Sequence, residues 1–374
     1  MKRFCGILTV VLAVAFFAAT GFAQSSGDDH VAWKRCLGQK ASWYSGNEAV
    51  RIAENVLLHQ RSSGGWPKNT EMAVVFTAGG KSKLRAEKTR KDSTIDNGAT
   101  CSQLRYLAKV CTATGNARFK AAFLKGVDYL LEAQYANGGW PQFYPFRGGY
   151  SNHITFNDGA MINVMNLLGD IRERKADYAF VDGKRRAAAA DAIAKGIECI
   201  LKCQIVVGGK RLAWCAQHDE KTFQPRKARS YELASLSGAE GVGIVEYLMA
   251  IEKPSPKIVA AIEDAVRWFA TAKITGIRRI SKPAPGTEKG RDKVIVLDPD
   301  ARPLWARFYQ IGTNKPIFCS RDGIIRENLA EISYERRNGY SWYTSAPANL
   351  LDKSYPRWRK KWTPDRNVLA PNAG

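Results

Sequence analysis

Apolar residues recur at helical spacing in several separated stretches of the chain. In residues 93–114, Leu104, Leu107 and Cys111 fall on one face of a helix. Two later stretches share this spacing and begin at His153 and Leu233. The pattern predicts a set of amphipathic helices, each packed through one face.

A second set of amphipathic helices ends in a recurring motif. Each helix runs to a glutamine, a Gly-Gly pair follows, and a tryptophan comes next. The glutamines are Gln60, Gln134 and Gln204, and the tryptophans are Trp66, Trp140 and Trp214, the last after an insertion. A Gly-Gly pair is a typical helix stop, because glycine readily adopts the left-handed conformation there.

The two helix sets alternate with a period of about 70 residues, which corresponds to two helices and two loops. This repeat predicts a mainly α fold, an α/α toroid-like ring of about three helical hairpins. Equivalent loops of neighbouring hairpins then meet at one end of the ring, around one cleft. The charged residues 81–91 are predicted to form a surface loop in the first hairpin. Residues 292–362 contain short β and irregular segments, so these lie mostly C-terminal.

The first residues have the pattern of an export signal. Lys2 and Arg3 precede an apolar run, and Gly21-Phe22-Ala23 supplies small residues for cleavage. We expect residues 1–23 to be a signal peptide and residues 24–374 to be a single secreted domain, extracellular or periplasmic. The alternative is a membrane anchor, but the run is short for a span of ~20 residues. We expect no membrane span after signal removal.

The chain carries 57 Lys and Arg against 35 Asp and Glu, a formal net charge of +22. For an exported protein this charge favours an anionic polysaccharide or a membrane surface over nucleic acid. Charge alone is equally compatible with plain solubility. The part after residue 23 contains seven cysteines, an odd number, and none has CxxC spacing. A zinc site is therefore not indicated. The cysteines are expected in the core, with one or two disulfides.

Carboxylates precede the helices of the first set. They are Asp96, beside Asn97, then Asp158 and Glu240. Asp96, Asn97 and Asp158 are candidate ligands of a hard cation such as calcium, which prefers oxygen donors. The competing reading is that the two aspartates are helix N-caps, a position that Asp and Asn favour.

Basic residues are concentrated in the loops expected at the cleft. They are Lys68, Arg229, Arg302, Arg307 and Arg321. The last three lie among aromatic residues, which suits a sugar acid, because its ring face is apolar and its carboxylate is charged. A solvated basic surface over packed aromatics is the alternative. His218 and Asp219 are a single adjacent His-Asp pair, and we interpret them as structural residues.

The ordered motifs GGWPKN, TIDNGAT, NGGWPQFYP, NHITFNDGAM, WCAQHD, ARSYELASLSGAE and DARPLWARFYQIGTNKPIFCSRDG resemble the pectate lyases of polysaccharide lyase family 10. They span about residues 47–343. The resemblance implies the α/α toroid and a secreted lyase, expected as a monomer. It would cut α-1,4-polygalacturonate by calcium-assisted β-elimination and release 4,5-unsaturated oligogalacturonates.

The resemblance also implies roles for individual residues. Arg321 matches the family's proposed base, Asp96 and Asp158 match calcium-binding acids with Asn97 nearby, and Arg229 and Arg307 match carboxylate binders. Lys68 and Arg302 are carried over from the surrounding motif and their charge. Gly159 follows Asp158 where many relatives have a second aspartate, which would weaken calcium binding if that carboxylate were a ligand. From the residues alone, two alternatives remain: a glycoside hydrolase that pairs Asp96 with Asp158, and a non-catalytic pectin-binding protein.

Overall fold

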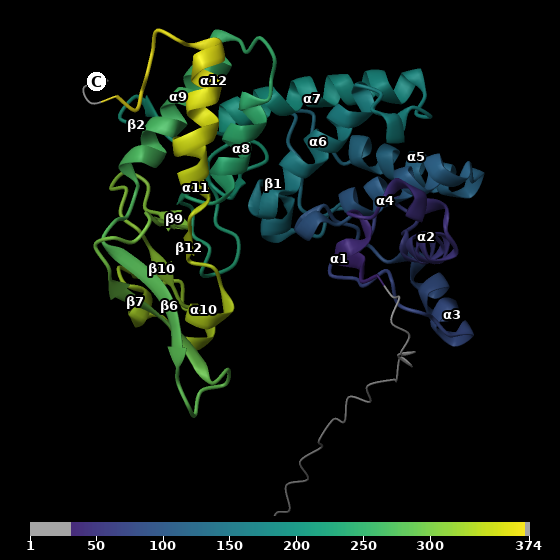
Figure 1. The fold of residues 1–374 in the computed structure, drawn as a ribbon, viewed down its shortest axis with the longest axis horizontal. Helices are drawn as coiled ribbons and strands as arrows, with labels where there is room; N and C mark the ends of the chain where they lie inside the picture. The colour runs from purple at the N-terminus through teal and green to yellow at the C-terminus, as the bar shows by residue number, and fades with distance from the viewer. Residues whose placement is uncertain (1–30, 371–374) are drawn as a thin grey trace, which may run out of the picture.

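The structure is a computed structural model that describes residues 31–370, so the expected signal peptide lies outside the described residues. The helices stand in pairs that form two layers (Figure 1). One layer contains α2 (Asn47–His59), α5 (Ala117–Glu132), α7 (Gly183–Cys203) and α9 (Pro256–Thr271). The other contains α4 (Cys101–Thr114), α6 (Ala160–Arg172), α8 (Glu240–Met249), and α11 (Ala346–Asn349) with α12 (Tyr355–Trp362). Their apolar faces build one continuous core that runs from Cys36 to Trp358.

The recurring glutamines and tryptophans tie the hairpins together. Each glutamine amide donates to a carbonyl in its own loop and to a carbonyl of the next helix in its layer. These second acceptors are Ala122, Ala192 and Ala261, for Gln60, Gln134 and Gln204. Each tryptophan is buried, and its indole N–H donates to the helix that precedes it. The tryptophans therefore bond carbonyls in the last turn of the preceding helix, and the glutamines tie each helix end to the interior of the next helix in its layer.

A fourth, degenerate unit follows the three predicted hairpins. The Trp305 indole donates to Phe269 O of α9 at 2.8 Å, as the earlier tryptophans do to their helices. The π-helical turn Leu350–Ser354 between α11 and α12 packs against α8 and α9. The mainly α toroid is confirmed, and the ring has one unit more than the sequence repeat indicates.

Short antiparallel strands join neighbouring units at one end of the ring. β1 (Ile154–Thr155) pairs with β4 (Gln217–His218), and β5 (Leu236–Ser237) pairs with β9 (Phe308–Tyr309). β8 (Trp305–Ala306) pairs with β12 (Tyr343–Thr344) within the fourth unit. The segments between each tryptophan and its return strand are thereby held side by side. These segments carry Lys68, Arg229, Arg307 and Arg321.

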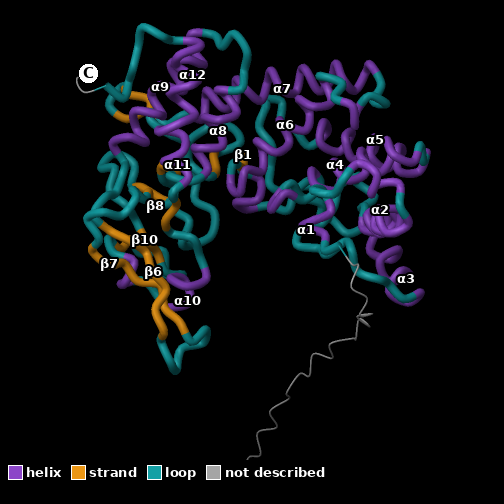
Figure 2. The backbone as a smooth tube through the Cα atoms, viewed as in Figure 1, coloured by secondary structure: helices purple, strands orange, loops and turns teal. Residues whose placement is uncertain are grey.

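The remaining strands lie mostly in the C-terminal part, as expected (Figure 2). They are β2 (Val206–Val207) with β3 (Lys210–Arg211), β6 (Ile277–Pro283) with β7 (Arg291–Leu297), and β10 (Phe318–Cys319) with β11 (Ile325–Arg326). A second apolar cluster, which includes Tyr231, Phe308, Phe318 and Trp342, supports this region beside α10 (Tyr334–Gly339).

Two details differ from the sequence expectations. Residues 81–91 are not a loop, because most of them belong to α3 (Ala78–Ala86) and a 3-10 turn (Glu87–Thr89). No disulfide forms between the seven described cysteines, which are all buried and free. The first short helix is α1 (Trp33–Cys36). Within residues 31–370, no helix is both long and apolar enough to cross a bilayer.

Candidate active site

Two matching turns carry the predicted carboxylates. They are Asp96–Gly98, before α4, and Asn157–Gly159, before α6, and they pack against each other. The middle residue of each is left-handed, with φ of +51° at Asn97 and +50° at Asp158, a conformation that Asn and Asp tolerate better than most residues.

Backbone hydrogen bonds fix the register of the repeat. Each tryptophan carbonyl accepts from a return-strand residue; these residues are Thr94, Thr155 and Ser237. The residues three positions after these donors are therefore structurally equivalent, and they are Asn97, Asp158 and Glu240. Asp96 therefore corresponds to Asn157, and the apparent match between Asp96 and Asp158 is shifted by one residue.

The N-cap interpretation of these aspartates is wrong. The cap positions of α4 and α6 are Thr100 and Gly159, and neither helix has a side-chain cap. Both aspartates lie in the turns before those positions, so another interaction must account for them.

Asp96 is almost fully buried, with 3% of its surface exposed. Its Oδ2 accepts a hydrogen bond from Lys68 Nζ, and its Oδ1 has no partner among the described residues. A buried carboxylate oxygen without a partner is costly. This oxygen is therefore well suited to a bound cation.

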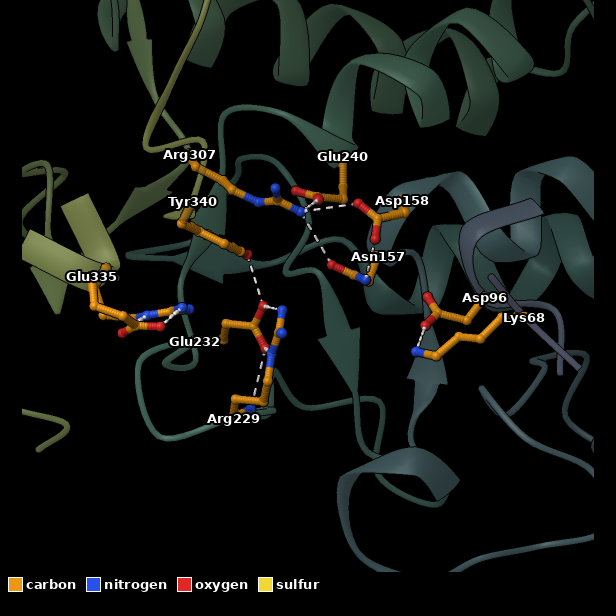
Figure 3. A network of polar contacts seen from close by, with 11 residues as sticks. Lys68, Asp96, Asn157, Asp158, Arg229, Glu232, Glu240, Arg307, Glu335 and Tyr340 are labelled. Carbon is orange, nitrogen blue, oxygen red and sulfur yellow. Dashed lines mark hydrogen bonds and ion pairs between the residues drawn. The ribbon is translucent and has the colours of Figure 1, made fainter. Parts of the chain in front are cut away.

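Asp158, Arg307 and Glu240 form a compact network (Figure 3). Nη2 of Arg307 lies 2.5 Å from Glu240 Oε1 and 3.3 Å from Asp158 Oδ1. The Glu240 side chain is 4% exposed, whereas that of Asp158 is 44% exposed. Burial, the largest single cause, opposes the charged form of Arg307, but Glu240, Tyr340 and Asp158 together outweigh it and raise the pKa of the guanidinium. Arg307 is thus a fixed cation beside an accessible carboxylate.

A second carboxylate holds Arg229. Glu232 accepts from Arg229 Nε at 2.7 Å and Nη2 at 2.5 Å, and from the Tyr340 hydroxyl at 2.7 Å. The two-pronged contact raises the pKa of Arg229, which stays positively charged. The Arg307 guanidinium lies over the Tyr340 ring at 4.7 Å, so Tyr340 connects the two arginines.

Arg321 lies in the turn between β10 and β11, and its side chain is 65% exposed. Its Nη2 is 2.9 Å from Glu335 Oε1, and the same carboxylate binds Arg336. The Tyr231 ring is flanked by Arg321 at 5.8 Å, Arg336 at 4.5 Å and Arg229 at 4.8 Å. Tyr231 thus brings Arg321 into the same cluster as Arg229.

Most of the predicted site residues therefore form one row. Figure 3 follows it from Lys68 and Asp96, through Asp158 and Arg307, to Arg229 and Glu335. Within residues 31–370, no hydrogen bond or ion pair joins Arg321 directly to Asp96 or Asp158. The connection from Arg321 to Asp158 runs through Tyr231, Tyr340 and Arg307, and Asp96 joins the row through the packing of its turn against that of Asp158.

Some predicted residues lie outside this network. The Asn97 amide donates to Asn69 at 2.9 Å, beside a pocket next to Trp33. Arg302 is exposed, and no hydrogen bond or ion pair in the described part of the chain ties it to the row. His218 is buried: its Nε2 accepts from Cys215 N–H and its Nδ1 donates to Phe223 O. The structural interpretation of His218 is confirmed.

Comparison with known proteins decides the class. The family model for pectic acid lyase matches residues 60–351. The chain belongs to the pectate lyases of family 10. A family 10 polysaccharide lyase from Cellvibrio cellulosa is 32% identical, with a TM-score of 0.73 over 87% of this chain and 94% of that one. A mutant of the Cellvibrio family 10 enzyme, in complex with trigalacturonic acid, is 31% identical with the same TM-score. It covers 87% of this chain and 98% of that one. No curated protein matches.

For a pectate lyase, the row of cations offers several contacts to a polymer of uronates. Membership of this family favours neither a hydrolase nor a non-catalytic binding protein. Sequence reasoning had no role for Glu240 and missed Glu232, Glu335 and Tyr340. Glu240 is signalled by its place in the repeat. The others lack such a signal, because their arginine partners are identified only by the folded chain.

Proposed function

We propose that this pectate lyase cleaves polygalacturonate by calcium-assisted β-elimination, with Arg321 as the base. The observation that carries the proposal is the buried Oδ1 of Asp96, which has no partner among residues 31–370 and lies in a turn that packs against the turn of exposed Asp158. The complex of the related Cellvibrio enzyme with trigalacturonic acid supports a galacturonate substrate.

The donor set fits calcium. Asp96 and Asp158 offer carboxylate oxygens, the hard ligands that calcium prefers. No group of three or more His, Cys, Asp or Glu in residues 31–370 could hold a metal by itself. The remaining ligands would therefore include oxygens of the substrate. Asn97 remains a predicted neighbour of the calcium ion. In the register of the repeat, Asn97 is equivalent to Asp158. When bound, calcium would neutralise the carboxylate of the reacting uronate and make its C5 proton more acidic.

The protein's own cations would act on the same carboxylates. Arg307 and Arg229 are each fixed by a buried glutamate, Glu240 or Glu232, so little reorganisation is needed when substrate binds. Lys68 beside Asp96 adds a further positive charge, and Arg302 would meet a more distant part of the polymer.

Arg321 would take the C5 proton on a guanidine nitrogen. The C5 electron pair then forms the C4–C5 double bond, and the bond from C4 to the glycosidic oxygen breaks. The departing oxygen gains a proton from solvent or from protonated Arg321. Arginine is normally charged, so a reaction with an arginine base is expected to run best at high pH. We therefore propose an alkaline optimum.

The test is the ultraviolet absorbance of the unsaturated product from polygalacturonate. Arg321→Ala should lose roughly 100-fold or more in kcat, and Arg321→Lys should recover little. Exposed Arg357 on α12 provides the control, since Arg357→Ala removes the same charge away from the row. Near wild-type turnover by Arg321→Ala would show that another group is the base.

A hydrolase that pairs Asp96 with Asp158 has less support. One of its two acids must carry a proton, whereas the neighbours here are Lys68 and Arg307. A product without ultraviolet absorbance would favour it.

We also propose export and a monomeric state. Residues 1–23 carry the signal pattern, so the exported protein should begin at Gln24. N-terminal sequencing of protein from the medium and periplasm tests the cleavage, and light scattering tests the monomer.

A further inference from the structure

A basic groove lies away from the row of site residues, at the N-terminal end of the ring. It has a volume of about 690 Å³ and is bordered by α2, α5, and α3 with the 3-10 turn that follows it. In Figure 1, α2, α3 and α5 stand at one end of the molecule, while α8 and α10, which lie at the row, are far from that end.

The charged side chains that line the groove are almost all basic. Leu57, Leu58, Ala121 and Ala122 give it an apolar part. Its cationic side chains are Arg51, Lys81, Arg85, Lys88, Arg118 and Lys125. The one acidic side chain among its described lining residues, Glu54, is already held by Arg118 at 2.7 and 2.9 Å.

Three of these cations are available to a ligand. Arg51 binds Glu48 and loop carbonyls, and Lys88 binds carbonyls of α2. Lys81, Arg85 and Lys125 are exposed, and within residues 31–370 they have no hydrogen bond or ion pair through their side chains.

The wall of the groove is fixed in place. Lys88 Nζ donates to Leu57 O at 2.5 Å and to Gln60 O at 2.9 Å, which fastens the 3-10 turn to the end of α2. Burial, followed by the positive charges of Lys125 and Arg61, lowers the pKa of Lys88. The groove is thus a formed concave surface with excess positive charge.

We propose that this groove binds a second stretch of acidic polysaccharide and tethers the enzyme to the polymer it cuts. A uronate chain presents apolar ring faces and regularly spaced carboxylates, which match the apolar part and the free cations. A concave site of this size is typical of small-ligand binding and suits a short oligosaccharide. A flat lipid surface would reach the bottom of this concave groove less well than a polysaccharide chain. The identity of the polymer rests on the proposed function.

The test compares two triple variants with equal loss of charge. The groove variant is Lys81→Gln, Arg85→Gln and Lys125→Gln. The control is Lys353→Gln, Arg357→Gln and Lys360→Gln, which are exposed residues at α12 on the other side of the ring. Melting temperatures establish that both are folded, and the single variant Arg85→Gln serves if the groove triple is unstable.

Binding to immobilised polygalacturonate is measured in EDTA, and kcat/KM is measured separately on polymer and on trigalacturonate. The groove variant should weaken polymer binding about tenfold, as expected for the loss of several exposed ion pairs. Its kcat/KM on trigalacturonate should stay at the wild-type value, and the control should match wild type in both assays.

Unchanged polymer binding by the groove variant would overturn the proposal, as would an equal loss in the control. Loss of binding only to vesicles that contain phosphatidylserine would assign the groove to a membrane instead. If wild type binds the polymer through the groove but does not cleave it, the proposed function fails and the tether survives.

Discussion

Arg307 and Glu240 form a buried ion pair that joins the fourth unit of the ring to the third. The two side chains are 12% and 4% exposed, and Nη2 lies 2.5 Å from Oε1. The same nitrogen reaches Asp158, so one arginine links a structural carboxylate to a carboxylate of the proposed calcium site. Arg307 therefore has a structural and a proposed substrate role.

These two roles can be separated by mutation. Arg307→Met leaves Glu240 buried without its partner and should lower the free energy of unfolding by about 3–5 kcal/mol. Adding Glu240→Met should restore most of that stability, because an apolar pair replaces the ion pair. Activity should remain lost in the double variant. Urea unfolding and the absorbance assay measure both. Recovery of activity with stability would remove Arg307 from substrate binding.

Glu335 should control the pH dependence of the reaction. Arg336, followed by Arg321, lowers the pKa of Glu335 to about 2, so this carboxylate is charged at any working pH. Glu335→Gln removes the negative charge beside Arg321, which makes loss of a proton from Arg321 easier. The alkaline rise of kcat should move to lower pH, with kcat reduced because Arg321 is less well positioned. Glu327→Gln, at an exposed glutamate paired with Lys315, is the control. An unchanged pH profile would contradict the positioning role.

Buried histidines should limit stability in mild acid. Burial lowers the pKa of His59 and of His218 to about 4, below the ordinary value near 6.5. As the pH falls, these histidines therefore bind protons at a higher pH in the unfolded chain than in the folded chain. Stability is lost as the pH falls from about 6.5 to about 4, by up to about 3 kcal/mol for each histidine.

Urea unfolding at several pH values measures this slope. His59→Phe should keep its stability better across the window, because it removes one of the two titrating groups. A free energy of unfolding that does not change between pH 7 and pH 4 would contradict the account.

Local sequence chemistry was enough to predict most of the fold. The Gln, Gly-Gly and Trp motif marks a helix end whose carbonyls need donors, and the same contacts recur in three units. The fourth unit was missed because Trp305 lies 36 residues after its acceptor Phe269, with the β6–β7 hairpin inserted and no Gly-Gly pair before it. Residues 81–91 were misread because their charge pattern does not reveal that Lys88 fastens them to α2.

Part of the candidate site could be predicted from the sequence, and part of it only from the structure. Asp96, Asp158, Arg229, Arg307 and Arg321 were named from motifs, and contacts between residues distant in the chain place them in one row. Glu240 is marked by its place in the repeat, but Glu232 could not be recognised, because an acidic residue in a loop has no sequence feature that identifies its partner. The one-residue shift between Asp96 and Asp158 likewise needed the backbone hydrogen bonds.

The most direct test of calcium-assisted elimination is the rate of ultraviolet absorbance increase on polygalacturonate, before and after EDTA treatment and after calcium is restored. EDTA should abolish the increase and calcium should restore it. The Asp96→Asn variant should need at least about tenfold more calcium for half-maximal activity, because one charged ligand is lost. An EDTA-treated enzyme that produces unsaturated product at the untreated rate would contradict the account.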